Sequence, residues 1–175
     1  MSFFGKPDIE KMRRDGDIAG LVHWADFRRD KSVSRAAVWG LRENVYELVE
    51  YLYETAASAH ARRGPGRRGP SPRSVYLLNE TVTALVKVGP AAVTPLADSV
   101  RVYDDYGDPE VSLRFLYVAL VFEVLQKIGR PAADEVRSFA HDKDSDVRKL
   151  ARQVLEKMDQ RGQLDDEEDP DDEPG

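Results

Sequence analysis

The amino-acid sequence predicts an all-α fold, namely a right-handed α-solenoid (an α-α superhelix) of about four helical hairpins. Three observations lead to this prediction. Apolar residues recur at helical spacing along most of the chain, polar turns rich in Asp, Gly and Pro separate these stretches, and the resulting helix-turn-helix unit occurs several times. Because one hairpin cannot cover its own apolar face, consecutive hairpins are expected to stack side by side.

The most apolar stretch, residues 111–129, is predicted to form the central helix. It is apolar on nearly every face, so neighbouring helices should cover it on several sides. It is also too short and too often charged for a membrane span, which needs about 20 predominantly apolar residues. Phe115 and Leu120 are therefore expected in the core, where a change to Asp would bury an unpaired charge and abolish folding.

The chain before this helix is expected to contain a short capping helix at 7–14 and a first hairpin at about 17–44. Asp17 is the predicted N-cap of the first helix of that hairpin, and a polar turn at 30–32 separates its two helices. Small residues on one side of the second helix allow close helix packing.

Three further hairpins are expected at about 45–89, 90–129 and 130–158, which gives a repeat domain over 1–160. The second hairpin carries a segment rich in Gly, Pro and Arg at 64–74. Neither a helix nor a strand tolerates this composition, so the segment is predicted to be a flexible insertion.

The acidity of the chain is concentrated at its C-terminal end. Residues 165–173 contain eight acids, whereas 24 acids and 26 bases remain over residues 1–164. The net charge of −6 therefore belongs to the end of the chain, and the rest is nearly neutral. Because such a charged segment cannot bury apolar area, residues 161–175 are predicted to be a disordered acidic tail.

The composition also limits the chemistry that the chain can perform. The sequence contains no cysteine, which excludes disulfides, thiolate metal sites and cysteine nucleophiles. No continuous apolar segment of a secretory signal follows the first residues, so a soluble, cytoplasmic protein without membrane association is expected.

Short motifs recur with the period of the predicted hairpins. Residues 88–93 and 128–133 share an aliphatic residue, Gly and a Pro-Ala restart at a separation of 40 residues. Residues 108–111 and 144–147 share an acidic turn followed by Val at a separation of 36 residues, and 30–33 is an earlier copy. A helix pair that recurs at roughly 36 to 47 residues is typical of α-solenoids.

On these motifs the chain resembles the HEAT-repeat family, in the short form shared with the repeats of phycobilin lyases. The resemblance covers about residues 17–158 and departs from the family pattern at 45–89, which has the insertion and lacks the acidic turn. It implies stacked hairpins whose second helices line a concave face. It implies little about function, since such repeats serve many unrelated roles.

No catalytic residue, metal ligand or cofactor site is indicated by the sequence. The three histidines, His23, His60 and His141, are isolated, and no serine lies in a nucleophile motif. The chain lacks the His-Glu dipeptides that bind iron in HEAT-built hydroxylases, so the resemblance does not extend to them. We therefore expect a non-catalytic protein.

The second helices are predicted to leave a row of residues exposed for binding. Our interpretation is an adaptor that binds a protein partner on this concave ridge, because exposed Trp, Tyr and Arg are typical of interface hot spots. Trp39 could instead pack on the capping helix or on Tyr76. The candidate binding residues are Arg35, Trp39, Arg42, Tyr76, Asn79, Lys87, Arg114, Tyr117, Lys149 and Arg152.

Two alternatives remain open. Five arginines of the insertion could bind phosphates and make the chain a nucleic-acid-binding protein. The resemblance to phycobilin lyases also allows a bilin-lyase-like accessory protein. The acidic tail could lie against the basic loop as an internal competitor. The basic loop residues are Arg62, Arg63, Arg67, Arg68 and Arg73.

Overall fold

All regular structure in the described part of the chain is helical. The computed structural model describes the backbone of residues 7–61, 71–105 and 111–165, with side chains for 7–61, 71–102 and 113–162. Within these ranges there is no strand, and no helix combines the length and apolar character needed to cross a bilayer. The α-helices are α1 (Ile9–Asp15), α2 (Ile18–Ala25), α3 (Lys31–Glu43), α4 (Val45–Ala61), α5 (Pro72–Val88), α6 (Val93–Asp105), α7 (Val111–Ile128), α8 (Ala133–Phe139) and α9 (Ser145–Asp165), and the 3₁₀ turns are η1 (Gly89–Ala92) and η2 (Arg130–Ala132).

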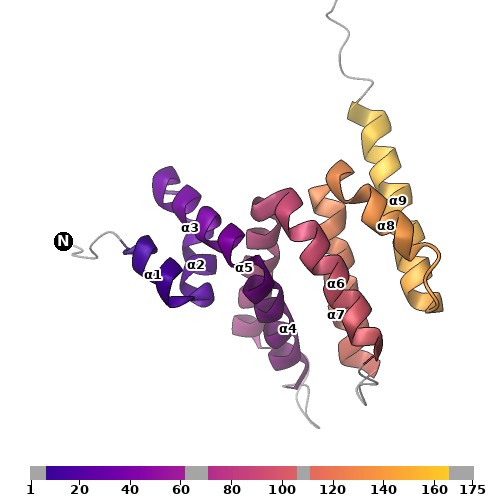
Figure 1. Ribbon diagram of the computed structural model, residues 1–175, viewed down its shortest axis with the longest axis horizontal. Coiled ribbons are helices and arrows are strands. Elements are labelled where there is room, and N and C mark those ends of the chain that lie inside the picture. The colour runs from indigo at the N-terminus through magenta and orange to yellow at the C-terminus, as the bar shows by residue number, and fades with distance from the viewer. Residues whose placement is uncertain (1–6, 62–70, 106–110, 166–175) are drawn as a thin grey trace, which may run out of the picture.

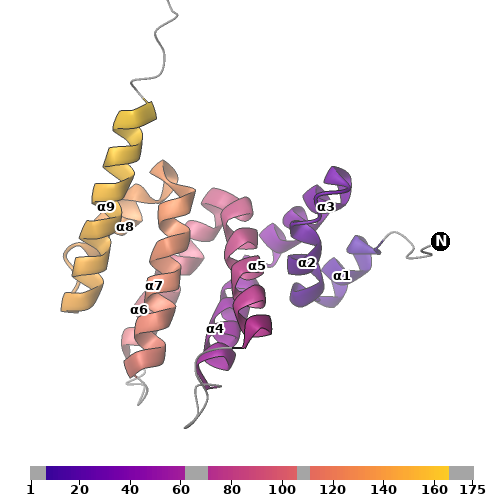
Figure 2. The ribbon, with the colours of Figure 1, turned by 180° about the vertical axis from the view of Figure 1, so that it is seen from behind.

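The helices pack in pairs that follow one another along the long axis of the molecule (Figure 1). In chain order, α2 packs on α3, α4 on α5, α6 on α7 and α8 on α9, while α1 packs on α2 and α3. The first helices of successive pairs contact one another, and so do the second helices α3, α5, α7 and α9. Figure 2, which is turned by 180° from Figure 1, brings α5, α7 and α9 to the front.

Side-chain caps define where several helices begin. Asp17 accepts a hydrogen bond from the backbone N–H of Gly20 at 2.9 Å, which confirms it as the N-cap of α2. Ser71 caps α5 by accepting from the N–H of Ser74 at 3.1 Å. Because of this cap, α5 begins at Pro72, and residues 72–74 of the predicted insertion form its first turn.

The same turn follows two of the second helices. Gly89 after α5 has φ 71° and Gly129 after α7 has φ 79°, conformations that residues with a Cβ rarely adopt. Gly89 is the first residue of η1 and Gly129 precedes η2, and each 3₁₀ turn has proline near its start, Pro90 in η1 and Pro131 in η2. The recurring Gly and Pro in the sequence therefore correspond to one recurring turn between pairs.

Helix α7 is covered by other helices on several sides, as its sequence predicts. It packs against α4, α5, α6, α8 and α9. Its buried side chains are Leu113, Tyr117, Val118, Leu120, Val121, Phe122, Val124 and Leu125. One stripe of α7 nevertheless stays open, because Phe115, Glu123 and Lys127 are exposed at helical spacing.

The expectation that Phe115 lies in the core is therefore wrong, whereas Leu120 is buried as expected. The exposed fractions of the two side chains are 54% and 8%. The flanking second helices α5 and α9 contact α7 on either side and leave the face of Phe115 uncovered.

Candidate functional site

Four of the predicted binding residues meet in one groove. Arg35, Trp39 and Arg42 of α3 lie opposite Lys87 near the end of α5, and the space between them has a volume of about 330 Å³. We call this space the α3–α5 groove. It is lined by Ser34, Arg35, Val38, Trp39, Arg42, Lys87 and Val88.

The packing of α2 on α3 determines which side chains of α3 line the groove. The opposite side of α3 is buried, with Val33, Ala37, Gly40 and Leu41 facing the core. Gly40 permits this contact, because a Cβ at that position would lie 3.3 Å from both methyl carbons of Leu21. Helical periodicity then directs Arg35, Trp39 and Arg42 away from the core.

The indole of Trp39 is 55% exposed, so the alternative in which it packs on the capping helix or on Tyr76 is wrong. The other tryptophan behaves differently. Trp24 is partly buried and makes edge contacts with the rings of His23 at 5.4 Å and Phe27 at 4.8 Å. Trp39 therefore offers a large apolar surface that its own chain does not cover.

A second hollow continues the groove toward the start of α3. It has a volume of about 290 Å³ and adds Arg28 and Lys31 to the basic side chains, while sharing Ser34, Arg35 and Lys87 with the first. The sequence interpretation placed Arg28 at the end of the preceding helix and Lys31 in the polar turn, and it missed this role for both residues. The signal was present, because Lys31, Arg35 and Arg42 follow one another at spacings of four and seven residues, which place them on one helix face.

Among the basic side chains of the groove, Lys87 has an acidic partner, whereas the others do not have one among the described side chains. The Lys87 ammonium donates to the carbonyl oxygen of Ala25 at 2.9 Å and to Oδ1 of Asp26 at 2.6 Å. In contrast, Arg28, Lys31, Arg35 and Arg42 make no ion pair with any residue for which side chains are described. Four cationic groups beside an exposed indole form a surface suited to an anionic ligand with an apolar part.

Tyr76 and Asn79 are exposed as predicted but lie outside the α3–α5 groove. Eleven residues separate Tyr76 from Lys87, which corresponds to about 16 Å along the helix axis. The Tyr76 hydroxyl donates to Oε1 of Glu80 at 2.6 Å, and this hydrogen bond raises the pKa of Tyr76. His23 Nδ1 lies 3.6 Å from the same oxygen, so this group links α2 to α5.

Tyr117 was predicted on the exposed ridge, and this prediction is wrong. Its side chain is 1% exposed. The hydroxyl donates to Oγ of Ser99 on α6 at 2.7 Å, and the ring meets Tyr53 of α4 edge-on at 5.4 Å. Position 117 belongs to the buried face of α7, together with Leu113 and Leu120, because these positions are separated by three and four residues. Burial raises the pKa of Tyr117 to about 12, against a smaller opposing effect of the hydrogen bond with Ser99.

Arg114 forms part of a smaller hollow of about 60 Å³ between α7 and α9. Its guanidinium donates to Oδ2 of Asp144 at 2.9 Å. Exposed Phe115 lies beside it, a residue that the sequence interpretation had assigned to the core. The hollow is lined by Arg114, Phe115, Val118, Asp144, Asp146, Val147 and Leu150.

Asp144 links this hollow to the start of α9. Its Oδ1 accepts from the backbone N–H of Asp146 at 2.7 Å and of Val147 at 3.5 Å. Partial burial by itself would raise the pKa of Asp144, but these two N–H groups together with Arg114 outweigh it, so the pKa is lowered. The ionised carboxylate thus holds α7 and α9 together.

The remaining candidate residues are not brought into either hollow. Lys149 and Arg152 are exposed on α9, and Lys149 pairs with Asp146 at 3.4 Å. Arg73 is exposed in the first turn of α5. The other basic loop residues lie outside the described residues; they are Arg62, Arg63, Arg67 and Arg68. The predicted disordered tail began at residue 161, but α9 continues as a helix to Asp165, so the prediction is wrong for 161–165; residues 166–175 lie outside the described residues.

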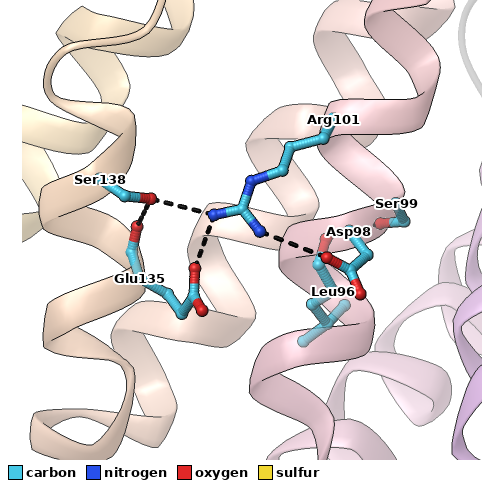
Figure 3. A network of polar contacts seen from close by, with 6 residues as sticks. All are labelled: Leu96, Asp98, Ser99, Arg101, Glu135 and Ser138. Atoms are coloured by element: carbon cyan, nitrogen blue, oxygen red, sulfur yellow. Dashed lines mark hydrogen bonds and ion pairs between the residues drawn. The ribbon is translucent and has the colours of Figure 1, made fainter.

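A network of polar contacts centred on Arg101 joins helices of two neighbouring pairs. Arg101 of α6 donates to Oε2 of Glu135 at 2.7 Å and to Oγ of Ser138 at 3.1 Å on α8, and to Asp98 of its own helix (Figure 3). Its guanidinium also lies 5.0 Å from the ring centre of Phe139. These contacts connect the third pair of helices to the fourth.

Among the described side chains, no group of three His, Asp or Glu residues could hold a metal ion.

Comparison of the chain with models of known protein families, with curated proteins and with solved structures found no match in any of the three. The chemistry of the α3–α5 groove is therefore the basis for a functional proposal.

Proposed function

We propose that the chain is a HEAT-like α-solenoid that acts as a non-catalytic scaffold and binds a protein partner along its second helices. The order of the helix contacts supports the fold, since first helices contact first helices and second helices contact second helices. The recurring turn at Gly89 and Gly129 supports a repeated unit. Aspartate caps at Asp30 and Asp144 begin the second helices of the first and last pairs in the same way.

The observation that carries the binding role is the exposed indole of Trp39 between Arg35 and Arg42. Trp and Arg are the residue types that contribute most to protein interfaces, especially when they meet in a concave surface. Phe115, which is 54% exposed in the hollow between α7 and α9, is a second apolar group on the same series of helices. A partner that covers either side chain gains apolar burial.

The test compares two exposed aromatic residues on different layers. Trp39→Ala removes the groove residue, and Tyr46→Ala removes a 63% exposed tyrosine on the first helix α4. We expect Trp39→Ala to lower the yield of specific partners captured from the native cell by about tenfold or more, as for a hot spot. Tyr46→Ala should retain them. Equal capture by both variants, with unchanged circular dichroism, would contradict the proposal.

Nucleic acid is the second candidate ligand, because cations without an ion-pair partner in the described part of the chain, beside an exposed indole, also suit phosphates and a stacked base. Retention on heparin that falls steeply with salt and is lost in the Arg35→Glu/Arg42→Glu variant would favour it. The bilin-lyase-like alternative stays a prediction. Quenching of Trp39 fluorescence by a tetrapyrrole would support that alternative.

A further inference from the structure

We propose that the α3–α5 groove binds the acidic C-terminal segment, residues 165–173, of a second copy of this chain. This inference rests on the proposed function, in which the second helices bind a protein, and it names the partner. Two features of the chain lead to it: the groove cations that have no ion-pair partner among the described side chains, and the order of residues in the acidic segment.

The groove presents charge, then an apolar surface, then charge again. Lys31 and Arg35 precede Trp39 on α3, and Arg42 follows it. The helix rise separates Lys31 from Arg35 by about 6 Å and Arg35 from Arg42 by about 10 Å. Since these side chains make no ion pair with any described side chain and Trp39 is 55% exposed, a ligand needs anionic groups on both sides of an apolar group.

The acidic segment has the same order. Its sequence, Asp-Asp-Glu-Glu-Asp-Pro-Asp-Asp-Glu, has acids on both sides of Pro170 and no base. Side chains two residues apart on an extended peptide are separated by about 6.6 to 6.8 Å, close to the spacing of Lys31 and Arg35. Proline packs well on exposed aromatic rings, so Pro170 can cover Trp39 while the flanking acids meet the cations.

The acidic segment is too short to reach the α3–α5 groove of its own chain, so the segment that occupies the groove must come from a second copy. The α3 and α9 helices lie at opposite ends of the row of pairs, and the C-terminal end of α9 extends beyond the neighbouring helices (Figures 1 and 2). Three steps between adjacent second helices, at 8 to 10 Å each, separate α3 from α9 by about 24 to 30 Å. Residues 166–173 span at most about 28 Å when fully extended. Crossing the molecule would use at least about 24 Å of this length and leave at most about one residue for the groove.

The resulting contact joins different surfaces of the two copies, so it can repeat from one copy to the next. Individual exposed ion pairs are weak, and several must act together with the burial of Trp39. Salt screens such pairs, so the association should be strong only at low ionic strength.

Sedimentation velocity of the full chain tests this directly. At an ionic strength of about 0.02 M we expect the average mass to rise with concentration, and at about 0.5 M we expect monomer only. The Arg35→Glu/Arg42→Glu variant should remain monomeric at both. The matched control, Lys157→Glu/Arg161→Glu, makes the same change of charge at two exposed α9 residues and should still associate.

A complementation experiment identifies the two surfaces. One chain carries Arg35→Glu/Arg42→Glu, and the other carries Asn or Gln in place of each acid of 165–173. Each should be monomeric alone, and the two should form a one-to-one complex when mixed, because one supplies the segment and the other the groove. Circular dichroism establishes that both are folded.

A parent chain that stays monomeric at low salt, or a mixture that forms no complex, overturns the inference. If the chain stays monomeric but binds a labelled oligodeoxythymidine through Arg35 and Arg42, the groove is a nucleic-acid site instead. Loss of native partners in Trp39→Ala without any self-association would leave the proposed function in place and remove this inference alone.

Discussion

The ammonium of Lys87 on α5 lies 2.6 Å from the carboxylate of Asp26, the residue that ends α2. The same ammonium donates to the carbonyl oxygen of Ala25 at the end of α2, which also accepts from the Ser34 hydroxyl at 2.6 Å. One side chain thus connects the first pair of helices to the second at the edge of the α3–α5 groove.

The variant Lys87→Met tests how much the contacts of Lys87 with α2 contribute to the stability of the chain. The aliphatic part of the side chain is retained, while the charge and both hydrogen bonds are lost, so we expect the free energy of unfolding to fall by about 0.5 to 1 kcal/mol. Urea denaturation measures this change. Lys157→Met, at an exposed position on α9, should change stability by less than about 0.5 kcal/mol. Equal effects of the two substitutions would show that the Lys87 contacts contribute nothing.

Tyr117 should ionise only at strongly alkaline pH. Its pKa of about 12 lies above the usual value near 10, so the folded state holds the phenol proton more tightly than the unfolded state. The stability from this group is fully present below pH 10 and is lost as the pH rises through 12. Absorbance at 295 nm should show a late phase of tyrosine titration, and Tyr117→Phe should remove that phase. A late phase that persists in Tyr117→Phe would contradict the assignment.

Asp144 should stabilise the chain at neutral pH and lose this effect in acid. Its pKa is lowered, so the unfolded state binds the proton more readily, and the contribution is present above the usual carboxyl pKa and lost as pH falls through the folded value. Asp144→Asn keeps a good N-cap but removes the charge that faces Arg114. The difference in unfolding free energy between the parent and Asp144→Asn should therefore be larger at pH 7 than at pH 3. A pH-independent difference would indicate that only the cap matters.

Phe115→Asp and Leu120→Asp should have opposite outcomes although both lie on α7. The Phe115 side chain is 54% exposed, so Asp there remains solvated and the helical circular dichroism should persist. Leu120 is 8% exposed, and Asp there buries an unpaired charge at a cost of several kcal/mol, which should unfold the chain. Loss of structure in Phe115→Asp would place that residue back in the core.

The sequence predicts local features well where one residue type has one physical role. Asp17 caps α2 because its short carboxylate reaches a backbone N–H, and this depends on neighbouring residues only. Gly129 ends α7 because its φ of 79° excludes a Cβ. The apolar stretch 111–129 predicts a helix covered on several sides for the same reason, since its composition alone requires burial.

The assignment of faces could not be made from the sequence where both faces of a helix are apolar. Phe115 and Tyr117 are two residues apart on α7, and the sequence interpretation placed the phenylalanine inside and the tyrosine outside. The opposite arrangement occurs because the Tyr117 hydroxyl finds Ser99 on α6 and its ring finds Tyr53 on α4. Both partners are distant in sequence, so no local pattern could identify them.

The sequence by itself determined the helical state of the described chain and several helix ends. It also determined that Arg35, Trp39 and Arg42 face outward together. These features depend on periodicity and backbone chemistry. Only the tertiary structure decided that Lys87 joins this set and that Arg28, Lys31, Arg35 and Arg42 remain without ion pairs among the described side chains. The physical reason is that a groove and its net charge arise from the packing of α3 against α5, and that packing brings together residues more than forty positions apart.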